Sequence, residues 1–385
     1  MTALEASPRV SRDDDEHRNP REHCCSAGDD ASMADGFPPQ PARPTGSFAP
    51  RWGSSPLALS DMAQYDLPLA ELREYRPDVR EASGFDTFWA RTLEADQPVI
   101  AKEVAFDNRL TTIETFDVSF SGFDGAPIKA WLHVRAGASA PLPTVVSYRG
   151  HSESRGMPFD ATFASAGYAQ FVMDSRGQGW HGSNFFGGTA DLHTDAGTFG
   201  PPGPMTKGIV SAETYYYRRL VTDAARLLQY AAGHRLVDPS RLFVTGGSQG
   251  GYLAIAAAGL APSLGIGLAG ALPDVPFMCT IRRGVELTDN QPYSLVADFL
   301  KAAPHLEEQV WETLSHFDGV SFAKRATCPA YFSVALSDPT CPPSTVFPAF
   351  NAWGGAKDIE VYPYNTHEGG GDVQLWKQLG WLASH

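Results

Sequence analysis

A glycine-rich turn that carries one serine constrains this chain more than any other segment. The letters GGSQGG occupy positions 246–251, between an apolar run at 242–245 and an alanine-rich run at 252–258. A buried strand, a sharp turn and a helix are predicted, and G-x-S-x-G in that setting is typical of a nucleophile elbow. We therefore predict that Ser248 is a nucleophile and that the backbone N–H of Gln249, at the start of the helix, can face an oxyanion.

A phosphate-binding turn is the alternative interpretation of the same letters, because helix N-termini also bind anions. The chain has no G-x-x-x-x-G-K-[ST] sequence, and the predicted strand lies far from the chain start, where a dinucleotide-binding fold usually begins. The nucleophile is therefore the favoured interpretation.

Composition narrows the class of partner. The formal net charge is -14, which disfavours nucleic acid and anionic membrane surfaces and suits a small neutral substrate. No run of about 18 apolar residues is present, so we expect no transmembrane helix. The five cysteines are an odd, sparse set without CxxC pairs, which argues against a disulfide framework and a structural zinc site and favours a reducing compartment. The letters HCC at 23–25 could bind a metal, but we interpret them as incidental and expect no metal or cofactor.

Residues 1–61 differ in composition from the rest of the chain. They include DDDE at 13–16 and PPQP at 38–41 and little periodic apolar sequence, which predicts a disordered extension. Charged residues interrupt the place where the apolar core of a secretory signal would lie. A second hypothesis is that Met62 is the true translation start. In either case, residues 62–385 are expected to form one folded domain.

From residue 62 onward, apolar runs alternate with helical stretches. This pattern predicts an α/β-hydrolase fold, with a mostly parallel sheet and helices on both of its faces. We expect a helical cap at 274–316, inserted after the nucleophile helix and the following strand, and a functional loop at 175–210. The expected strands are 113–121 and 128–134 as an antiparallel pair, 144–148, 168–173, 242–245, 266–271, 330–334 and 359–362, and the expected helices are 69–75, 85–93, 158–165, 212–233 and 373–382.

The rest of a catalytic triad should follow the serine in the order acid, then histidine. Asp338 comes just after the predicted strand 330–334, which makes it the expected acid, although it could instead start a turn or cap a helix. Asp274, at the end of an earlier strand, is the second choice. His367 lies between the last predicted strand and the last helix and is the expected base.

An oxyanion hole needs a second N–H group, which this fold takes from the loop after an early strand. The letters RGH at 149–151 occupy that position. We predict that the N–H of His151 faces the N–H of Gln249, with a small acyl pocket bounded by His151 and Pro276. The alternative for Gly150 is a simple turn glycine.

With these residues in place, the chain resembles carbohydrate esterase family seven, the acetyl xylan esterases and cephalosporin-C deacetylases, over residues 62–385. Three motifs carry the resemblance in order: RGQ at 176–178, GGSQG at 246–250 and HE at 367–368. Further similar segments are TYYYRR at 214–219, DVPF at 274–277, HFDGV at 316–320 and CPPSTVF at 341–347.

The resemblance implies a triad of Ser248, Asp338 and His367, with structural roles near the site for Arg176 and Gln178. It also implies deacetylation of small acetylated sugars or of cephalosporin C, without a cofactor, in a cytoplasmic homohexamer whose active sites face an inner cavity. The chain departs from the family pattern at His151, where a tyrosine is usual, and in its N-terminal extension.

Other functions remain open at this level, because fold alone does not decide function. One alternative is a broader short-chain carboxylesterase or a serine peptidase on the same fold. The other is a non-catalytic binding protein on a decayed hydrolase fold, against which the presence of all three triad residues and of the elbow glycines argues.

Overall fold

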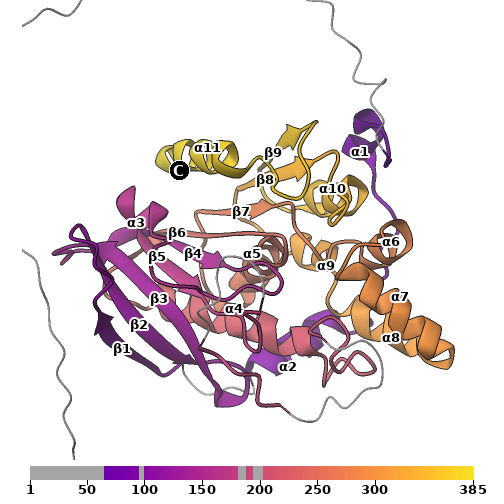
Figure 1. Ribbon diagram of the computed structural model, residues 1–385, viewed down its shortest axis with the longest axis horizontal. Coiled ribbons are helices and arrows are strands. Elements are labelled where there is room, and N and C mark those ends of the chain that lie inside the picture. Colours follow the sequence, from indigo (N-terminus) through magenta and orange to yellow (C-terminus); the bar gives the residue numbers. More distant parts are fainter. Residues whose placement is uncertain (1–64, 95–98, 181–187, 194–202) are drawn as a thin grey trace, which may run out of the picture. The chain divides into compact units, whose positions relative to one another are not determined.

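One sheet organises the computed structural model, which describes residues 65–94, 99–180, 188–193 and 203–385 (Figure 1). Within these residues nine strands form the sheet, in the order β1-β2-β3-β5-β4-β6-β7-β8-β9. The strands are β1 (Ala101–Phe106), β2 (Ile113–Ser121), β3 (Pro127–Arg135), β4 (Leu142–Tyr148), β5 (Ala169–Met173), β6 (Val237–Gly247), β7 (Gly270–Asp274), β8 (Ala330–Ala335) and β9 (Lys357–Tyr362). The predictions about residues 1–61 and the translation start lie outside the described residues.

The sheet is antiparallel at one edge and parallel across the rest. The pairs β1 with β2, β2 with β3, and β3 with β5 are antiparallel. Strand β2 pairs with β3 from Ile113 opposite Arg135 to Ser121 opposite Pro127. Strands β5, β4, β6, β7, β8 and β9 pair parallel. The predicted antiparallel pair and the mostly parallel sheet are therefore confirmed.

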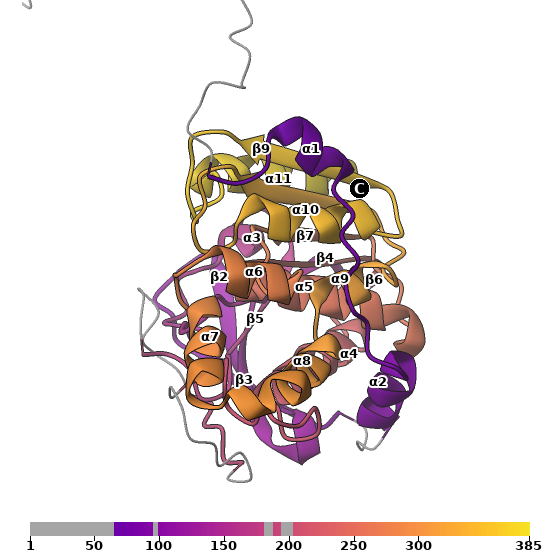
Figure 2. The same ribbon diagram turned by 90° about the vertical axis from the view of Figure 1, so that its right-hand side faces the viewer.

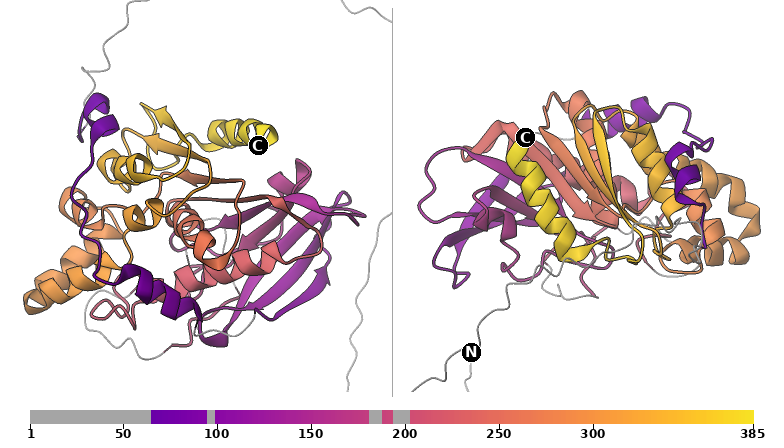
Figure 3. Two further views of the ribbon diagram at one scale, coloured as in Figure 1. Left: turned by 180° about the vertical axis from the view of Figure 1, so that it is seen from behind. Right: turned by 90° about the horizontal axis from the view of Figure 1, so that it is seen from above.

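Helices cover both faces of the sheet. On one face lie α3 (Thr162–Ser165) and α11 (Gly371–Ser384), and on the other lie α4 (Tyr216–Ala232) and α5 (Gln249–Leu260) (Figure 1). Seen from above, α11 lies across the strands (Figure 3). Alternate residues of β6 serve the two faces: Phe243 packs in one cluster with Leu382 of α11, whereas Val244 belongs to the larger core that includes α4 and α5.

Helix α5 is buried along its whole length, and all of its residues are inaccessible to solvent. A helix that is apolar all round is expected in a protein interior, which accounts for the alanine-rich sequence after the elbow. The remaining helices include α1 (Leu69–Glu74), α2 (Phe85–Glu94), α9 (Gly319–Ala323) and α10 (Pro343–Ala352). None of the helices in the described ranges is long and apolar enough to cross a membrane.

The predicted insertion after β7 is helical. It contains α6 (Ile281–Leu287), α7 (Tyr293–Ala302) and α8 (Glu307–Ser315), which stand together in the foreground of Figure 2. The sharp turn between β7 and α6 uses three residues with positive φ that are not glycine: Val275, Met278 and Thr280.

Sequence predictions differ from the structure at several places, among them the helix predicted at 212–233, which begins only at Tyr216, and the strand predicted at 242–245, which is part of the longer β6. The strand predicted at 266–271 begins only at Gly270, because the chain before it still closes the preceding helix through a hydrogen bond from Ile266 N to Ala261 O (3.0 Å). The helix predicted at 158–165 contains helical residues only from Thr162. Strand β1 was missed, since it is an edge strand with few buried side chains and charged residues in its middle.

A buried chain of polar side chains crosses β2 and β3. Asn108 Nδ2 donates to Thr115 Oγ1 (2.7 Å), which lies 2.8 Å from Nδ1 of His133. The His133 side chain is fully buried, and this burial lowers its pKa to about 4. The ring is therefore neutral at pH 7, with Nδ1 accepting the threonine hydroxyl.

Replacing His133 by glutamine should flatten part of the pH dependence of stability. The folded-state pKa is lowered, so the stabilisation by neutral His133 is complete above pH 6.5 and is lost as the pH falls toward 4. The wild type should lose about 3 kcal/mol more than His133→Gln between these limits. Urea unfolding of both proteins at pH 7, 6, 5 and 4 measures the difference, and parallel stability curves would contradict the assignment.

Candidate active site

Ser248 lies in a strained turn between β6 and α5. Its φ of 56° and ψ of -119° are rare for a residue with a side chain. Two backbone hydrogen bonds hold it there: Ser248 N donates to Asp274 O (2.9 Å), and Phe277 N donates to Ser248 O (3.0 Å). The end of β7 and the segment that follows it thus fix the serine on both sides.

Two of the elbow glycines are required by close backbone packing. A Cβ atom on Gly246 would lie 2.5 Å from the carbonyl carbon of Gly250, and one on Gly250 would lie 2.3 Å from Tyr148 O. At Gly247 there is nothing within 4 Å of that position. The spacing G-x-S-x-G therefore reflects the contact of the α5 N-terminus with the ends of β4 and β6.

Asp338 and His367 form a hydrogen-bonded pair. Asp338 follows β8 and is fully buried, whereas His367 lies between β9 and α11 and is partly exposed. His367 Nδ1 and Asp338 Oδ2 are 2.9 Å apart. The other oxygen, Oδ1, accepts from the N–H groups of Thr340 (2.8 Å) and Cys341 (2.9 Å). Because an ionised carboxylate only accepts, Nδ1 carries the proton and Nε2 is free to act as a base.

Cys341 joins the serine to this pair. Its buried Sγ lies within 4.8 Å of a carboxylate oxygen of Asp338 and of a ring nitrogen of His367. The side chain of Ser248 lies close enough to the same thiol to influence its pKa. Burial and the neighbouring Asp338 raise the pKa of Cys341, so the thiol is neutral. Sequence reasoning passed over this residue, although its spacing from Asp338 was visible.

Tyr65 was also missed, because no local pattern links it to the site. Its hydroxyl donates to the backbone carbonyl of Asp338. The next residue, Asp66, accepts from Ser344 N (2.7 Å) through its carboxylate. The first described residues of the chain therefore brace the loop that carries the acid.

The candidate oxyanion loop follows β4, beside the elbow. Tyr148 at the end of β4 pairs with Gly246 of β6, and the Gln249 side chain crosses between them, with Nε2 donating to Arg149 O (3.3 Å) and Gly150 O (3.2 Å). Among the described residues no partner is found for the N–H groups of His151 and Gln249. Both N–H groups are therefore available to a ligand.

Gln178 connects the oxyanion loop to the elbow. Its Oε1 accepts from Ser152 N (2.6 Å), and its Nε2 donates to Gln249 Oε1 (3.0 Å) and to the Tyr216 hydroxyl (2.8 Å). Tyr217 O–H donates to the same Oε1 of Gln249 (3.1 Å). This amide network sets the position of residues 149–152 relative to α5.

Arg176 lies outside this network and binds a residue of α4. Its Nε and Nη2 donate to the two carboxylate oxygens of Asp223 (2.6 and 2.7 Å), and Nη1 lies 3.6 Å from Asp191. The Arg176 side chain is fully buried. Removing either Arg176 or Asp223 would therefore leave the other charge buried without its partner. Within the described residues Arg176 has no hydrogen bond to Ser248, Asp338 or His367.

His151 and Pro276 lie on opposite sides of the elbow. His151 follows β4, one neighbour of β6, and Pro276 follows β7, the other neighbour. Burial lowers the pKa of His151 to about 4, so its ring is neutral. The ring meets the edge of the half-exposed Trp180, with centroids 5.8 Å apart.

Asp274, the second-choice acid, has a different role. Its carboxylate accepts from Gln374 Nε2 (3.0 Å) and Gln378 Nε2 (2.7 Å), both on α11. Burial raises its pKa to about 7. It has no hydrogen bond with His367 within the described ranges, and instead ties α11 to the strand beside the nucleophile.

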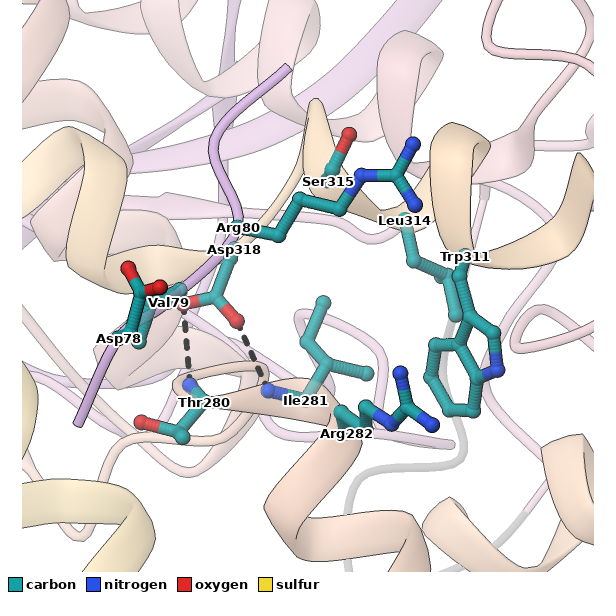
Figure 4. Close-up of a pocket in the computed structure, with 10 residues that line it drawn as sticks. All are labelled: Asp78, Val79, Arg80, Thr280, Ile281, Arg282, Trp311, Leu314, Ser315 and Asp318. Atoms are coloured by element: carbon teal, nitrogen blue, oxygen red, sulfur yellow. Dashed lines mark hydrogen bonds between the residues drawn. The ribbon is translucent and has the colours of Figure 1, made fainter. Parts of the chain in front are cut away.

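A pocket outside this arrangement lies between the segment 78–80, the start of α6 and α8 (Figure 4). Asp318 in its wall accepts from Thr280 N (3.0 Å) and Ile281 N (2.8 Å), the two contacts drawn in the figure, and from Val320 N (3.0 Å). This carboxylate is occupied in holding the start of α6. None of the candidate catalytic residues lines the pocket.

Comparison with known families gives one match over most of the chain. The family described as acetyl xylan esterase (AXE1) matches residues 62–385. A curated relative, acetyl esterase Axe7A of Xylanibacter ruminicola, is 29% identical over 182 residues, which are 47% of this chain and 39% of the relative. The matching part thus spans well under half of that relative's length.

Solved structures agree with the family match. An acetyl xylan esterase from Paenibacillus sp. R4 is 36% identical with a TM-score of 0.76, over 83% of this chain and 100% of that one. Acetyl xylan esterase 1 from Thermoanaerobacterium sp. JW/SL YS485 is 29% identical with a TM-score of 0.72, over 82% and 99% of the two chains. A prolyl endopeptidase structure, 17% identical with a TM-score of 0.51 over 71% of this chain and 39% of that one, shares the fold alone.

The elbow packing predicts different stabilities for alanine substitutions at two of its glycines, Gly250 and Gly247. Gly250→Ala should lower the free energy of unfolding by about 1–3 kcal/mol, because its Cβ meets backbone atoms that cannot rotate away. Gly247→Ala, with open space at its Cβ, is the matched control and should stay within about 0.5 kcal/mol of wild type. Urea unfolding measures both, and equal losses would refute the packing argument.

Proposed function

The chain belongs to the acetyl xylan esterase family, and we propose that it removes acetyl groups from small acetylated carbohydrates, such as xylo-oligosaccharides, through Ser248, His367 and Asp338. As a member of this family it is a carboxylic ester hydrolase. The observation that carries the assignment of the residues is the 2.9 Å contact between His367 Nδ1 and Asp338 Oδ2, next to a serine in an elbow.

The proposed reaction proceeds through an acetyl-enzyme. His367 Nε2 takes the proton of Ser248 as Oγ attacks the acetyl carbonyl carbon. The tetrahedral intermediate collapses, its bond to the sugar oxygen breaks, and His367 returns the proton to that oxygen. Water then attacks the acetyl-enzyme with His367 again as base, which releases acetate and restores the Ser248 hydroxyl.

Asp338 orients the imidazole and stabilises its charged form during both steps. Three hydrogen-bond donors converge on its carboxylate, from Thr340, Cys341 and His367. The Asp338 carboxylate is therefore held in a fixed orientation against the imidazole while the proton moves between serine and histidine.

The oxyanion is proposed to bind the N–H groups of Gln249 and His151, because the flanking N–H groups are already occupied. Gly150 N donates to Glu153 Oε2 (3.1 Å) and Ser152 N to Gln178. Each such donor is typically worth roughly 100- to 1000-fold in kcat. The two side chains that flank the elbow, His151 and Pro276, are proposed to limit the acyl pocket to acetyl groups.

Cephalosporin C is a further proposed substrate, since its acetyl ester needs the same small acyl pocket. We also propose a homohexamer in the cytoplasm, on the basis of the family resemblance and of the few cysteines. Light scattering on the purified protein measures the assembly directly. A monomer in solution would reject the hexamer but leave the proposed chemistry intact.

Hydrolysis of acetyl, butyryl and octanoyl 4-nitrophenyl esters tests the proposed reaction. Wild type should prefer acetyl strongly, and Ser248→Ala should lose about 10⁴-fold or more in rate. Ser263→Ala, just beyond the C-terminal end of α5, is the matched control and should retain full activity. Equal rates on the octanoyl ester would favour a broader carboxylesterase, and lack of fluorophosphonate labelling at Ser248 would favour a binding protein.

The amide network predicts a kinetic effect of Gln178. In Gln178→Ala the oxyanion loop loses the hydrogen bond from Ser152 N that ties it through Gln178 to Gln249 and Tyr216, and displacement of the loop should lower kcat by about 100-fold with a smaller change in KM. The exposed Gln309, which donates only to Val210 O (2.7 Å), provides the control Gln309→Ala. A change confined to KM would show that Gln178 contributes to substrate binding and does not position the oxyanion hole.

A further inference from the structure

Three metal-ligating side chains meet at the candidate active site. The donor atoms of Asp338, Cys341 and His367 all lie within 4.8 Å of one another, and no other group of three such donors is found in the part of the chain that the structure describes. The first two are held in one turn, because Asp338 Oδ1 accepts from Cys341 N (2.9 Å). His367 is joined to this turn by its 2.9 Å contact with Asp338.

A thiolate, an imidazole and a carboxylate together form a donor set for tetrahedral Zn²⁺. With bonds of about 2.3 Å to sulfur and about 2.0–2.2 Å to nitrogen and oxygen, the donors of such a site lie roughly 3.3–3.7 Å apart. The observed cluster needs a contraction of up to about 1.5 Å at its widest. The side chain of Ser248, which lies close to Cys341, or a water molecule can supply the fourth ligand.

We propose that a thiophilic divalent cation, Zn²⁺ or Cd²⁺, binds to Asp338, Cys341 and His367 and reversibly inhibits the enzyme. The bond to sulfur forms as the thiol of Cys341 releases its proton to solvent. The bound imidazole can no longer accept the proton of Ser248, so attack on the acetyl carbonyl stops. The cation acts as an inhibitor and takes no part in hydrolysis.

Access and selectivity follow from the exposure and chemistry of the donors. Cys341 and Asp338 are buried, but His367 and Ser248 are partly exposed, so the cation enters from the side on which substrate would bind. Hard cations such as Mg²⁺ prefer oxygen ligands in octahedral sites. They should therefore not inhibit.

The experiment has a binding readout and an activity readout. Cd²⁺ added to the full chain carrying Cys24→Ser and Cys25→Ser, which remove the competing thiols at positions 24 and 25, should give thiolate-to-metal charge-transfer absorption that saturates at one equivalent, and Zn²⁺ should displace it. In parallel, Zn²⁺ should inhibit hydrolysis of 4-nitrophenyl acetate, whereas Mg²⁺ should not. Cys341→Ala should lose the absorption and raise the Zn²⁺ inhibition constant by at least about 10-fold.

Cys328→Ala is the matched control, because Cys328 is a buried cysteine that precedes β8, whereas Asp338 follows it. This variant should keep both the absorption and the Zn²⁺ sensitivity of wild type. Ser248→Ala keeps the three ligands and should still give the Cd²⁺ signal, which provides a second test if Cys341→Ala does not fold. Loss of the signal in Cys328→Ala, or equal Zn²⁺ inhibition of wild type and Cys341→Ala, would overturn the site.

The inhibition readout rests on the proposed function, whereas the absorption readout does not. A wild type that fails to hydrolyse esters but shows the Cys341-dependent absorption would reject the proposed function and support the metal site. An active wild type that lacks the absorption would support the proposed function and reject the metal site.

Discussion

The strained backbone of Ser248 is the constraint on which the site depends. A residue with positive φ costs roughly 1–3 kcal/mol and persists only where its surroundings hold it. Here the holding groups are Asp274 O, at the end of β7, and Phe277 N, in the segment that follows. The end of β7 is in turn tied to α11 by the carboxylate of Asp274. The geometry of the serine therefore depends on a sheet neighbour and on the last helix of the chain.

The same dependence explains why so many polar side chains are buried around the elbow. Gln178, Gln249, Tyr216 and Tyr217 lie within the protein interior, where an unpaired amide or hydroxyl would be costly. Each makes at least one hydrogen bond within the network. A fully paired network of this kind gives the two N–H groups of the proposed oxyanion hole a fixed separation before substrate arrives, and preorganisation is the main source of electrostatic stabilisation in acyl transfer.

Burial also sets the charge of the groups near the serine. It lowers the pKa of His151 to about 4 and raises the pKa of Cys341, so both are neutral at pH 7. A neutral His151 ring adds no charge next to the proposed oxyanion site. Asp338, by contrast, has dedicated backbone donors to its carboxylate.

Local sequence patterns determined the elbow turn and the mostly parallel sheet, because these features arise from residues close together in the chain. They could not reveal β1, whose exposed edge carries little apolar signal, or the true start of β7, which depends on where the preceding helix closes. Tertiary structure alone decided that Tyr65 braces Asp338, that Asp274 binds α11, and that Cys341 contacts the nucleophile. The physical reason is distance along the chain: these contacts join residues that only the packing of the sheet and helices brings together.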